Sequence, residues 1–273
     1  MKFTLLGDFT VTESDDDVTP RPAKLRTLLA LLAVRHGETL TREAIVDELW
    51  GSTPPRNSLG TIQTYVYDIR KAFDAIDAGL GARTLLTRPQ GYSLASVGLE
   101  YDIDRFDELV DLGRSLLGHG STGASKEHLN RARDCLGEAL SLWRGEPLAN
   151  VARGDLLDSH VTWLFERKRH ILSTRQQIDM ALGRESELIG ELMVLTELYP
   201  FHEGFCETLM LALARTGRRS EALEVFQRLR QRLSEELGLE PGPSTQRLQR
   251  ALLDGDFEFT ARASETELHR MPL

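Results

Sequence analysis

The stretch that decides the fold is "NSLGTIQTYVYDIRKAFDA", Asn57 to Ala75. Its residues Ile62, Val66, Ile69 and Phe73 follow at steps of four, three and four, which places them on one stripe of an α-helix. The opposite face, at about 100° per residue, carries small and polar residues: Gly60, Thr64, Tyr67, Asp68 and Lys71, with Thr61, Tyr65 and Arg70 on its shoulders. A solvated helix usually carries Glu, Lys, Gln or Ala at such positions. This polar face therefore indicates contact with a partner.

Strands and two further helices are predicted around this helix. Residues 2–12 predict a strand broken at Gly7-Asp8, and "RPAKLRTLLALLAVRHG" predicts the first helix. In "LTREAIVDELWG", Thr41 is suited to cap a second helix, and two prolines in "GSTPPRNS" keep it from running into the third. After the third helix, residues 84–87 and 92–95 are strand-like runs joined by Arg88-Pro89-Gln90-Gly91. This is a hairpin signal with an arginine at its tip.

Strands, three helices and a terminal hairpin predict a winged helix, in which the third helix enters the major groove of DNA and the hairpin reaches the flanking backbone. Threonine and tyrosine hydroxyls can bond base edges or phosphates. Four cations could neutralise phosphates around them: Arg56, Arg70, Lys71 and Arg88. A groove that binds a partner protein, or a face without a role, remains an alternative on spacing alone.

The charge distribution is compatible with DNA binding only in the first part of the chain. The net charge is -9, from 33 Lys and Arg against 42 Asp and Glu, but residues 1–98 hold 11 against 12. The remaining 22 and 30 place nearly all the acidity in residues 99–273. We expect weak binding to non-specific DNA.

From residue 99 onward the pattern predicts an all-α region. "GRESELIGELMVL" from Gly183 and "GRRSEALEVFQRL" from Gly217 begin 34 residues apart, which is the period of a tetratricopeptide helix pair. Such helices could form a concave protein-binding surface, or they could simply complete a helical core.

The succession "RPAKLRTLLALLAV", "ELWGSTPPRNSLGTIQTYVYDIRKAF" and "TRPQGYSL" resembles the winged-helix domain of the SARP family, activators of antibiotic biosynthesis with an OmpR-type DNA-binding fold. The resemblance implies a major-groove helix over residues 58–73 and a wing arginine at Arg88. It implies DNA contacts for Thr61, Thr64, Tyr65, Tyr67, Arg70, Lys71 and Arg88. The chain departs from the family pattern at Asp68, where a basic or neutral residue is usual, and at Tyr67, where a small residue is common.

The second half resembles the bacterial transcriptional activation domain of the same family, in "EALSLWRGEPLANV" and in the run that begins "LMLALARTGRRSEALEVF" at Leu209 and ends "SEELGLEPGPSTQRLQRALLDGD". The expected fold is thus mainly α, with an α+β winged helix-turn-helix at 1–98, a tetratricopeptide-like helical domain at 99–255 and a loose tail at 256–273. The family resemblance implies direct repeats in double-stranded promoter DNA, bound side by side or as a homodimer. It further implies contact with RNA polymerase at sigma factor region four, through a loop of Trp50, Gly51, Ser52, Thr53, Pro54 and Pro55.

No pattern indicates catalysis, a cofactor or a metal. H-E-x-x-H, G-x-S-x-G and G-x-x-x-x-G-K-[ST] are all absent from the sequence, so we expect neither an enzyme nor ATP binding. Without an apolar run long enough to span a bilayer, we expect a cytoplasmic, nucleoid-associated protein that does not contact membranes. The rival functions are a tetratricopeptide-like adaptor and a winged-helix repressor.

Overall fold

The computed structural model describes residues 1–14, 16–118 and 125–255. They form two compact units. The first comprises Met1–Leu109 and Glu138–Lys168, and the second comprises Val110–Gly137 with the described residues from Arg169 onward. The domain boundary predicted near residue 98 stays a prediction. The tail predicted at 256–273 lies outside the described residues.

The first unit opens with a small sheet of the order β3-β2-β1-β7. Its strands are β1 (Lys2–Thr4), β2 (Thr10–Glu13), β3 (Asp16–Asp17) and β7 (Glu100–Tyr101). The predicted break at Gly7-Asp8 is confirmed, because β1 and β2 pair as antiparallel strands on either side of it. The prediction of an all-α region from residue 99 is wrong at β7, which pairs in parallel with β1. A two-residue strand has no alternation to detect, and only the open edge of β1 makes it a strand.

The three predicted helices and the hairpin are present. They are α1 (Ala23–Val34), α2 (Arg42–Trp50) and α3 (Ser58–Asp74), followed by a short α4 (Leu80–Thr84), β5 (Leu85–Thr87) and β6 (Gly91–Leu94). Thr41 caps α2 as expected, since its hydroxyl accepts a hydrogen bond from the Ala44 amide at 3.2 Å. The strand predicted from Thr84 begins one residue later, because Thr84 closes α4.

The hairpin is bound into a second sheet of the order β4-β6-β5, where β4 is Leu40–Thr41. Gly91 starts β6 opposite Thr41 of β4, and a Cβ at this position would lie 1.7 Å from the Leu40 carbonyl oxygen. Only glycine fits this close approach of two backbones. The sheet thereby fixes the wing against the start of α2.

A buried carboxylate joins the helix-turn-helix to the helical segment of the same unit. Glu48, on the last turn of α2, is 6% exposed. Its oxygens accept hydrogen bonds from the amides of Gly154 (2.8 Å), Leu156 (2.8 Å) and Leu157 (3.2 Å). These amides begin α7 (Asp155–Ala181) and have no partner within the helix. A carboxylate at a helix N-terminus is stabilised by both the amides and the helix dipole.

A second buried carboxylate secures the N-terminal sheet in the same manner. Asp102, the first residue of α5 (Asp102–Gly118), accepts hydrogen bonds from the amides of Leu5 (2.8 Å) and Leu6 (3.1 Å) and forms an ion pair with Arg144 (2.8 Å). Asn150 adds two hydrogen bonds to the backbone of Phe9. Residues 138–168 are therefore part of the scaffold that holds the winged helix.

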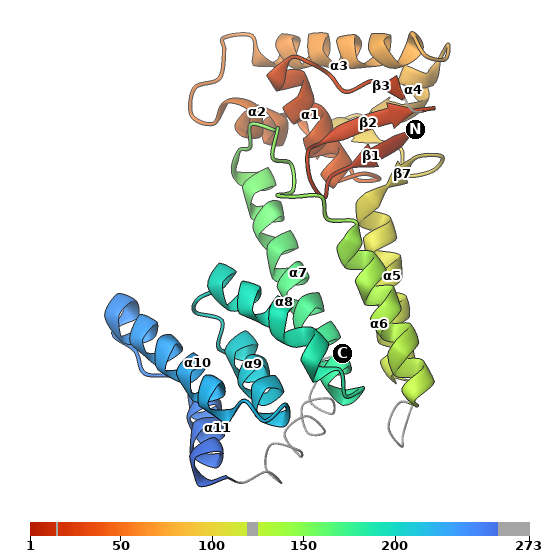
Figure 1. The fold of residues 1–273 in the computed structure, drawn as a ribbon. Coiled ribbons are helices and arrows are strands. Elements are labelled where there is room, and N and C mark those ends of the chain that lie inside the picture. Colours follow the sequence, from red (N-terminus) through yellow and green to blue (C-terminus); the bar gives the residue numbers. More distant parts are fainter. Residues whose placement is uncertain (15, 119–124, 256–273) are drawn as a thin grey trace. The chain divides into compact units, whose positions relative to one another are not determined.

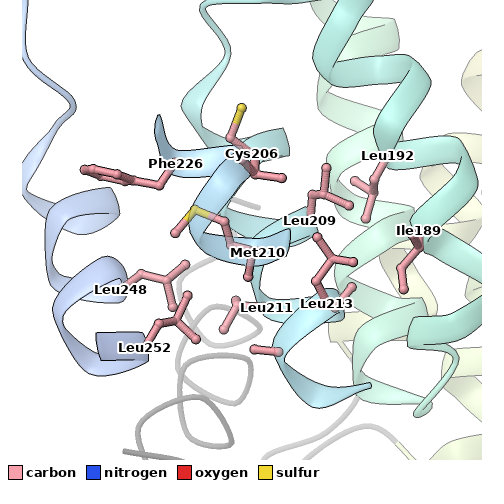
Figure 2. Close-up of a cluster of buried hydrophobic side chains, with 14 of the residues drawn as sticks. Ile189, Leu192, Cys206, Leu209, Met210, Leu211, Leu213, Phe226, Leu248 and Leu252 are labelled. Carbon is pink, nitrogen blue, oxygen red and sulfur yellow. The ribbon is translucent and has the colours of Figure 1, made fainter. Parts of the chain in front are cut away.

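The second unit is helical. It contains α8 (Glu185–Leu198), α9 (Glu203–Arg215), α10 (Arg219–Arg232), the π-helical turn η1 (Leu233–Leu237) and α11 (Pro243–Asp254), together with parts of α5, α6 (Lys126–Ser141) and α7. Figure 2 shows side chains of α8, α9, α10 and α11 meeting in one cluster, with Cys206 and Met210 inside it. Burial raises the pKa of the Cys206 thiol to about 11, which suits a packing role.

The predicted repeat at 34 residues is confirmed at its turns. Gly183 and Gly217 have φ of +75° and +79°. The amides that follow them donate to carbonyl oxygens five residues back, from Arg184 to Asp179 and from Arg218 to Leu213. Both turns are therefore glycine-ended helix termini of the same kind. Within the described part of the chain, none of the helices has the length and apolar character needed to cross a membrane.

Replacing Glu48 by Ala should destabilise the first unit by about 3 kcal/mol, because it leaves three backbone amides, of which that of Leu157 is buried, without an acceptor. Glu48→Gln keeps one acceptor oxygen, so its free energy of unfolding should lie between that of the alanine variant and that of the wild type. Urea unfolding measures the loss of stability, and hydrogen exchange should accelerate at the amides of residues 154–157.

The matched control is Glu43→Ala, which removes an exposed carboxylate from the first turn of the same helix. It should cost no more than about 0.5 kcal/mol. Equal losses for the two alanine variants would contradict the capping role of Glu48.

Candidate nucleic-acid interface

One face of α3 is fixed by the core of the first unit. Ile62, Val66, Ile69 and Phe73 are at most 2% exposed, which confirms the predicted apolar stripe. Asn57 caps the helix by accepting a hydrogen bond from the Gly60 amide at 3.2 Å. Figure 1 shows α3 along one edge of the unit, with the loop from α2 protruding at its start. The helix is thus held rigidly, with its other face directed outward.

The outward face presents exposed polar groups. Thr64, Tyr67, Asp68 and Lys71 are all exposed, and the Tyr67 side chain is 63% accessible. Arg56 is exposed just before the helix. Among the described residues no ion pair involves Arg56, Asp68 or Lys71. Lys71 and Asp68 on this face, and Arg56 before the helix, are consequently available to a ligand.

The residues predicted on the shoulders of α3 are half-buried and engaged within the unit. Thr61 donates its hydroxyl hydrogen to the Asn57 carbonyl at 3.0 Å, and the Tyr65 ring stacks on Trp50 with centroids 6.3 Å apart. Arg70 donates from Nε and Nη2 to the Leu85 carbonyl at 3.0 and 2.6 Å, and Nη2 also reaches the Thr87 hydroxyl at 2.8 Å. Arg70 therefore ties α3 to the wing, in addition to any contact that it makes outside the unit.

The wing ends in a tight two-residue turn at Pro89 and Gln90. The amides of Arg88 and Gly91 donate to each other's carbonyl oxygens at 2.9 and 3.2 Å. The Arg88 side chain is exposed, and only its Nε is bonded within the described part of the chain, to the Ser93 hydroxyl at 3.2 Å. The terminal nitrogens of this exposed side chain are therefore available to a ligand.

Sequence reasoning missed Arg42 as a residue that positions the wing. Its Nη1 donates to the Pro89 carbonyl at 3.0 Å, and its guanidinium lies 5.9 Å from the centre of the Tyr92 ring. The partners are far from Arg42 in sequence, so no local pattern signals the contact. Arg42 and Arg70 together brace the hairpin from α2 and from α3.

The loop between α2 and α3 is exposed throughout. Gly51, Ser52, Thr53, Pro54 and Pro55 are all exposed, whereas Trp50 at its start is half-buried. The Thr53 amide and hydroxyl both donate to the Trp50 carbonyl, at 3.1 and 3.2 Å. The loop is accordingly a short, internally bonded projection that leads into the start of α3.

The chemistry of this region is that of recognition. It offers hydroxyls, guanidinium and ammonium groups, and one carboxylate on a rigid helix and a braced hairpin. Among the described residues, no group of three or more His, Cys, Asp or Glu side chains could hold a metal ion.

Comparisons with known proteins agree with this geometry. Residues 17–94 match the family model for the C-terminal domain of transcriptional regulatory proteins, and residues 101–253 match the bacterial transcriptional activator domain. Regulatory protein DnrI of Streptomyces peucetius is 35% identical over 94% of this chain and 93% of its own length. Regulatory protein AfsR of Streptomyces griseus is 32% identical over 97% of this chain, which spans only 26% of AfsR.

A solved structure of EmbR from Mycobacterium tuberculosis, in complex with a low-affinity phosphopeptide, superposes with a TM-score of 0.86 at 26% identity. The match covers 98% of this chain and 69% of the EmbR chain. These matches cover nearly the whole chain and give a winged helix followed by an activator domain. They confirm the resemblance seen in the sequence. The chain belongs to the SARP family of DNA-binding transcriptional activators.

Proposed function

We propose that this protein activates a gene cluster for a secondary metabolite by binding direct repeats in promoter DNA and recruiting RNA polymerase through its sigma factor. In this proposal α3 occupies the major groove, and the wing contacts the neighbouring backbone. The observation that carries it is the outward face of α3, where Thr64, Tyr67 and Lys71 stay exposed on a helix whose other face is fully buried.

The residues divide by the roles proposed for them. Thr64 and Tyr67 face the base edges, while Arg56, Lys71 and Arg88 neutralise phosphates on either side. Thr61, Tyr65 and Arg70 remain proposed DNA contacts. Because each also has a partner inside the unit, their main role is to position α3, the loop and the wing.

Few cations contribute to binding, and the chain carries a net charge of -9. One copy should therefore hold a single half-site weakly at physiological salt. Two copies side by side on direct repeats, about one helical turn apart, would add their contacts. This arrangement explains how a modest basic surface selects a promoter.

The loop from Trp50 to Pro55 is the proposed contact with region four of the sigma factor. It is exposed, and the stacking of Trp50 on Tyr65 holds its start against α3. A loop of this size supplies a small contact that is weak by itself. It becomes effective when DNA places the polymerase nearby.

A protein-binding adaptor is the second candidate, and one observation favours it. Helix α8 exposes Met193, Val194 and Leu198, with Leu198 at 66%, in the unit that carries the helical repeat. Gel retardation with competitor DNA distinguishes this candidate, since an adaptor would bind no promoter sequence preferentially. Transcription from the promoter with purified polymerase then separates an activator from a repressor.

Lys71→Ala should weaken binding to all DNA sequences alike and reduce the slope of log K against log salt by about 1, because it removes one phosphate contact. Replacing Thr64 and Tyr67 together by Ala should instead change which sequences are preferred. Salt titrations on operator and random duplexes measure both effects. If the double variant folds and keeps both affinity and preference, α3 is not the recognition helix.

Arg88→Ala should lower operator affinity more than Arg83→Ala, since Arg88 is exposed beside the turn of the wing and no ion pair of the described residues involves it. Arg83 is a matched control, because it is also exposed and forms an ion pair with Asp77. Titrations at one salt concentration make the comparison. Equal losses would remove the special role of the wing tip.

Replacing Ser52 and Thr53 by Glu should abolish transcription in a purified system while leaving promoter occupancy nearly unchanged, because bulky charges block a surface that does not hold DNA. Footprinting measures occupancy on the same templates. A fall in transcription that only follows lost occupancy would make the loop a connector and shift the activating surface to residues 99–254.

A further inference from the structure

The Asp68 carboxylate stands on the outward face of α3, where a negative charge would oppose DNA binding. It is exposed, one helical turn after Thr64 and three residues before Lys71. Among the described residues it has no ion-pair partner that would neutralise it. Facing a phosphate, such a carboxylate would only repel. Facing a base edge, it can accept a hydrogen bond from an amino group of the base.

Thr64 offers the same kind of group on the same side of the helix. Its hydroxyl hydrogen is donated to the Gly60 carbonyl at 3.1 Å, so its oxygen presents lone pairs outward. Residues four apart lie about 6 Å apart along a helix and on one face. Thr64 and Asp68 therefore form a short row of hydrogen-bond acceptors, with the Lys71 ammonium beyond it.

A row of acceptors in the major groove is complementary to exocyclic amines, which are the N4 group of cytosine and the N6 group of adenine. Guanine presents N7 and O6 and thymine presents O4, all of them acceptors, so a carboxylate is repelled by these bases. Of the two amines, cytosine N4 is the usual partner of Asp and Glu.

We propose that Asp68 is a specificity determinant that accepts a hydrogen bond from cytosine N4 at one position of each half-site. This assignment rests on the proposed function, in which α3 enters the major groove. The carboxylate lowers affinity for every other base at that position and for non-specific DNA. It thus exchanges general affinity for selectivity.

The test is enrichment of duplexes from a random-sequence pool by the full-length wild type and, in parallel, by Asp68→Asn. The wild type should enrich a repeat with cytosine at one fixed position. Asp68→Asn removes the charge and adds an amide donor that other bases accept, so this preference should fall by roughly tenfold. Preferences at the other positions should stay, and affinity for random DNA should rise.

Asp8→Asn provides the control, since Asp8 is an exposed carboxylate in the turn between β1 and β2. It removes the same charge and should leave the enriched sequence unchanged. If Asp68→Asn enriches the same sequence as the wild type, with cytosine preferred equally, the assignment of Asp68 is wrong while the DNA-binding function stands. If the wild type enriches no sequence, both fail.

Discussion

The first unit depends on the cap that Glu48 places on the start of α7. The carboxylate is buried, and it satisfies three backbone amides that no other part of α7 can bond. Since Glu48 is on the last turn of α2, this contact fixes the end of α2 against residues 154–157. The loop from residue 51 and then α3 start from this fixed point. Asp102 is a second buried carboxylate that binds backbone amides, because it accepts hydrogen bonds from the amides of Leu5 and Leu6 beside the N-terminal sheet.

Polar groups around α3 consequently divide into two sets. Arg70, Arg42 and Thr61 make hydrogen bonds inside the unit, where they brace the wing and the helix. Lys71 and Arg56 remain exposed and outside any ion pair of the described residues. Rigid elements with a few free groups suit recognition, because little conformational entropy is lost on binding. Most of the acidic surplus of the chain lies in residues 99–273.

Local patterns predicted the features that depend on near neighbours. The buried stripe of α3, the Thr41 cap, the hairpin and the paired glycine turns at Gly183 and Gly217 all follow from spacing over a few residues. The family resemblance supplied the order of the two domains. Together these predicted the fold class and the face of α3 that points outward.

Features with distant partners could not be predicted in this way. The acceptor role of Glu48 involves amides more than one hundred residues away in the chain, and β7 becomes a strand only at the edge of β1. Local periodicity records which face is buried, but it does not record which polar side chains, such as Arg70, are already bonded.

In the proposed function the outward face of α3 lies in the major groove of repeated half-sites. Methylation interference on a bound promoter tests it directly, because dimethyl sulfate modifies guanine N7 in the major groove and adenine N3 in the minor groove. Methylated guanines should block binding in two clusters about one helical turn apart and in the same orientation. Interference confined to adenine N3, or none at any guanine within the protected region, would contradict major-groove reading by α3.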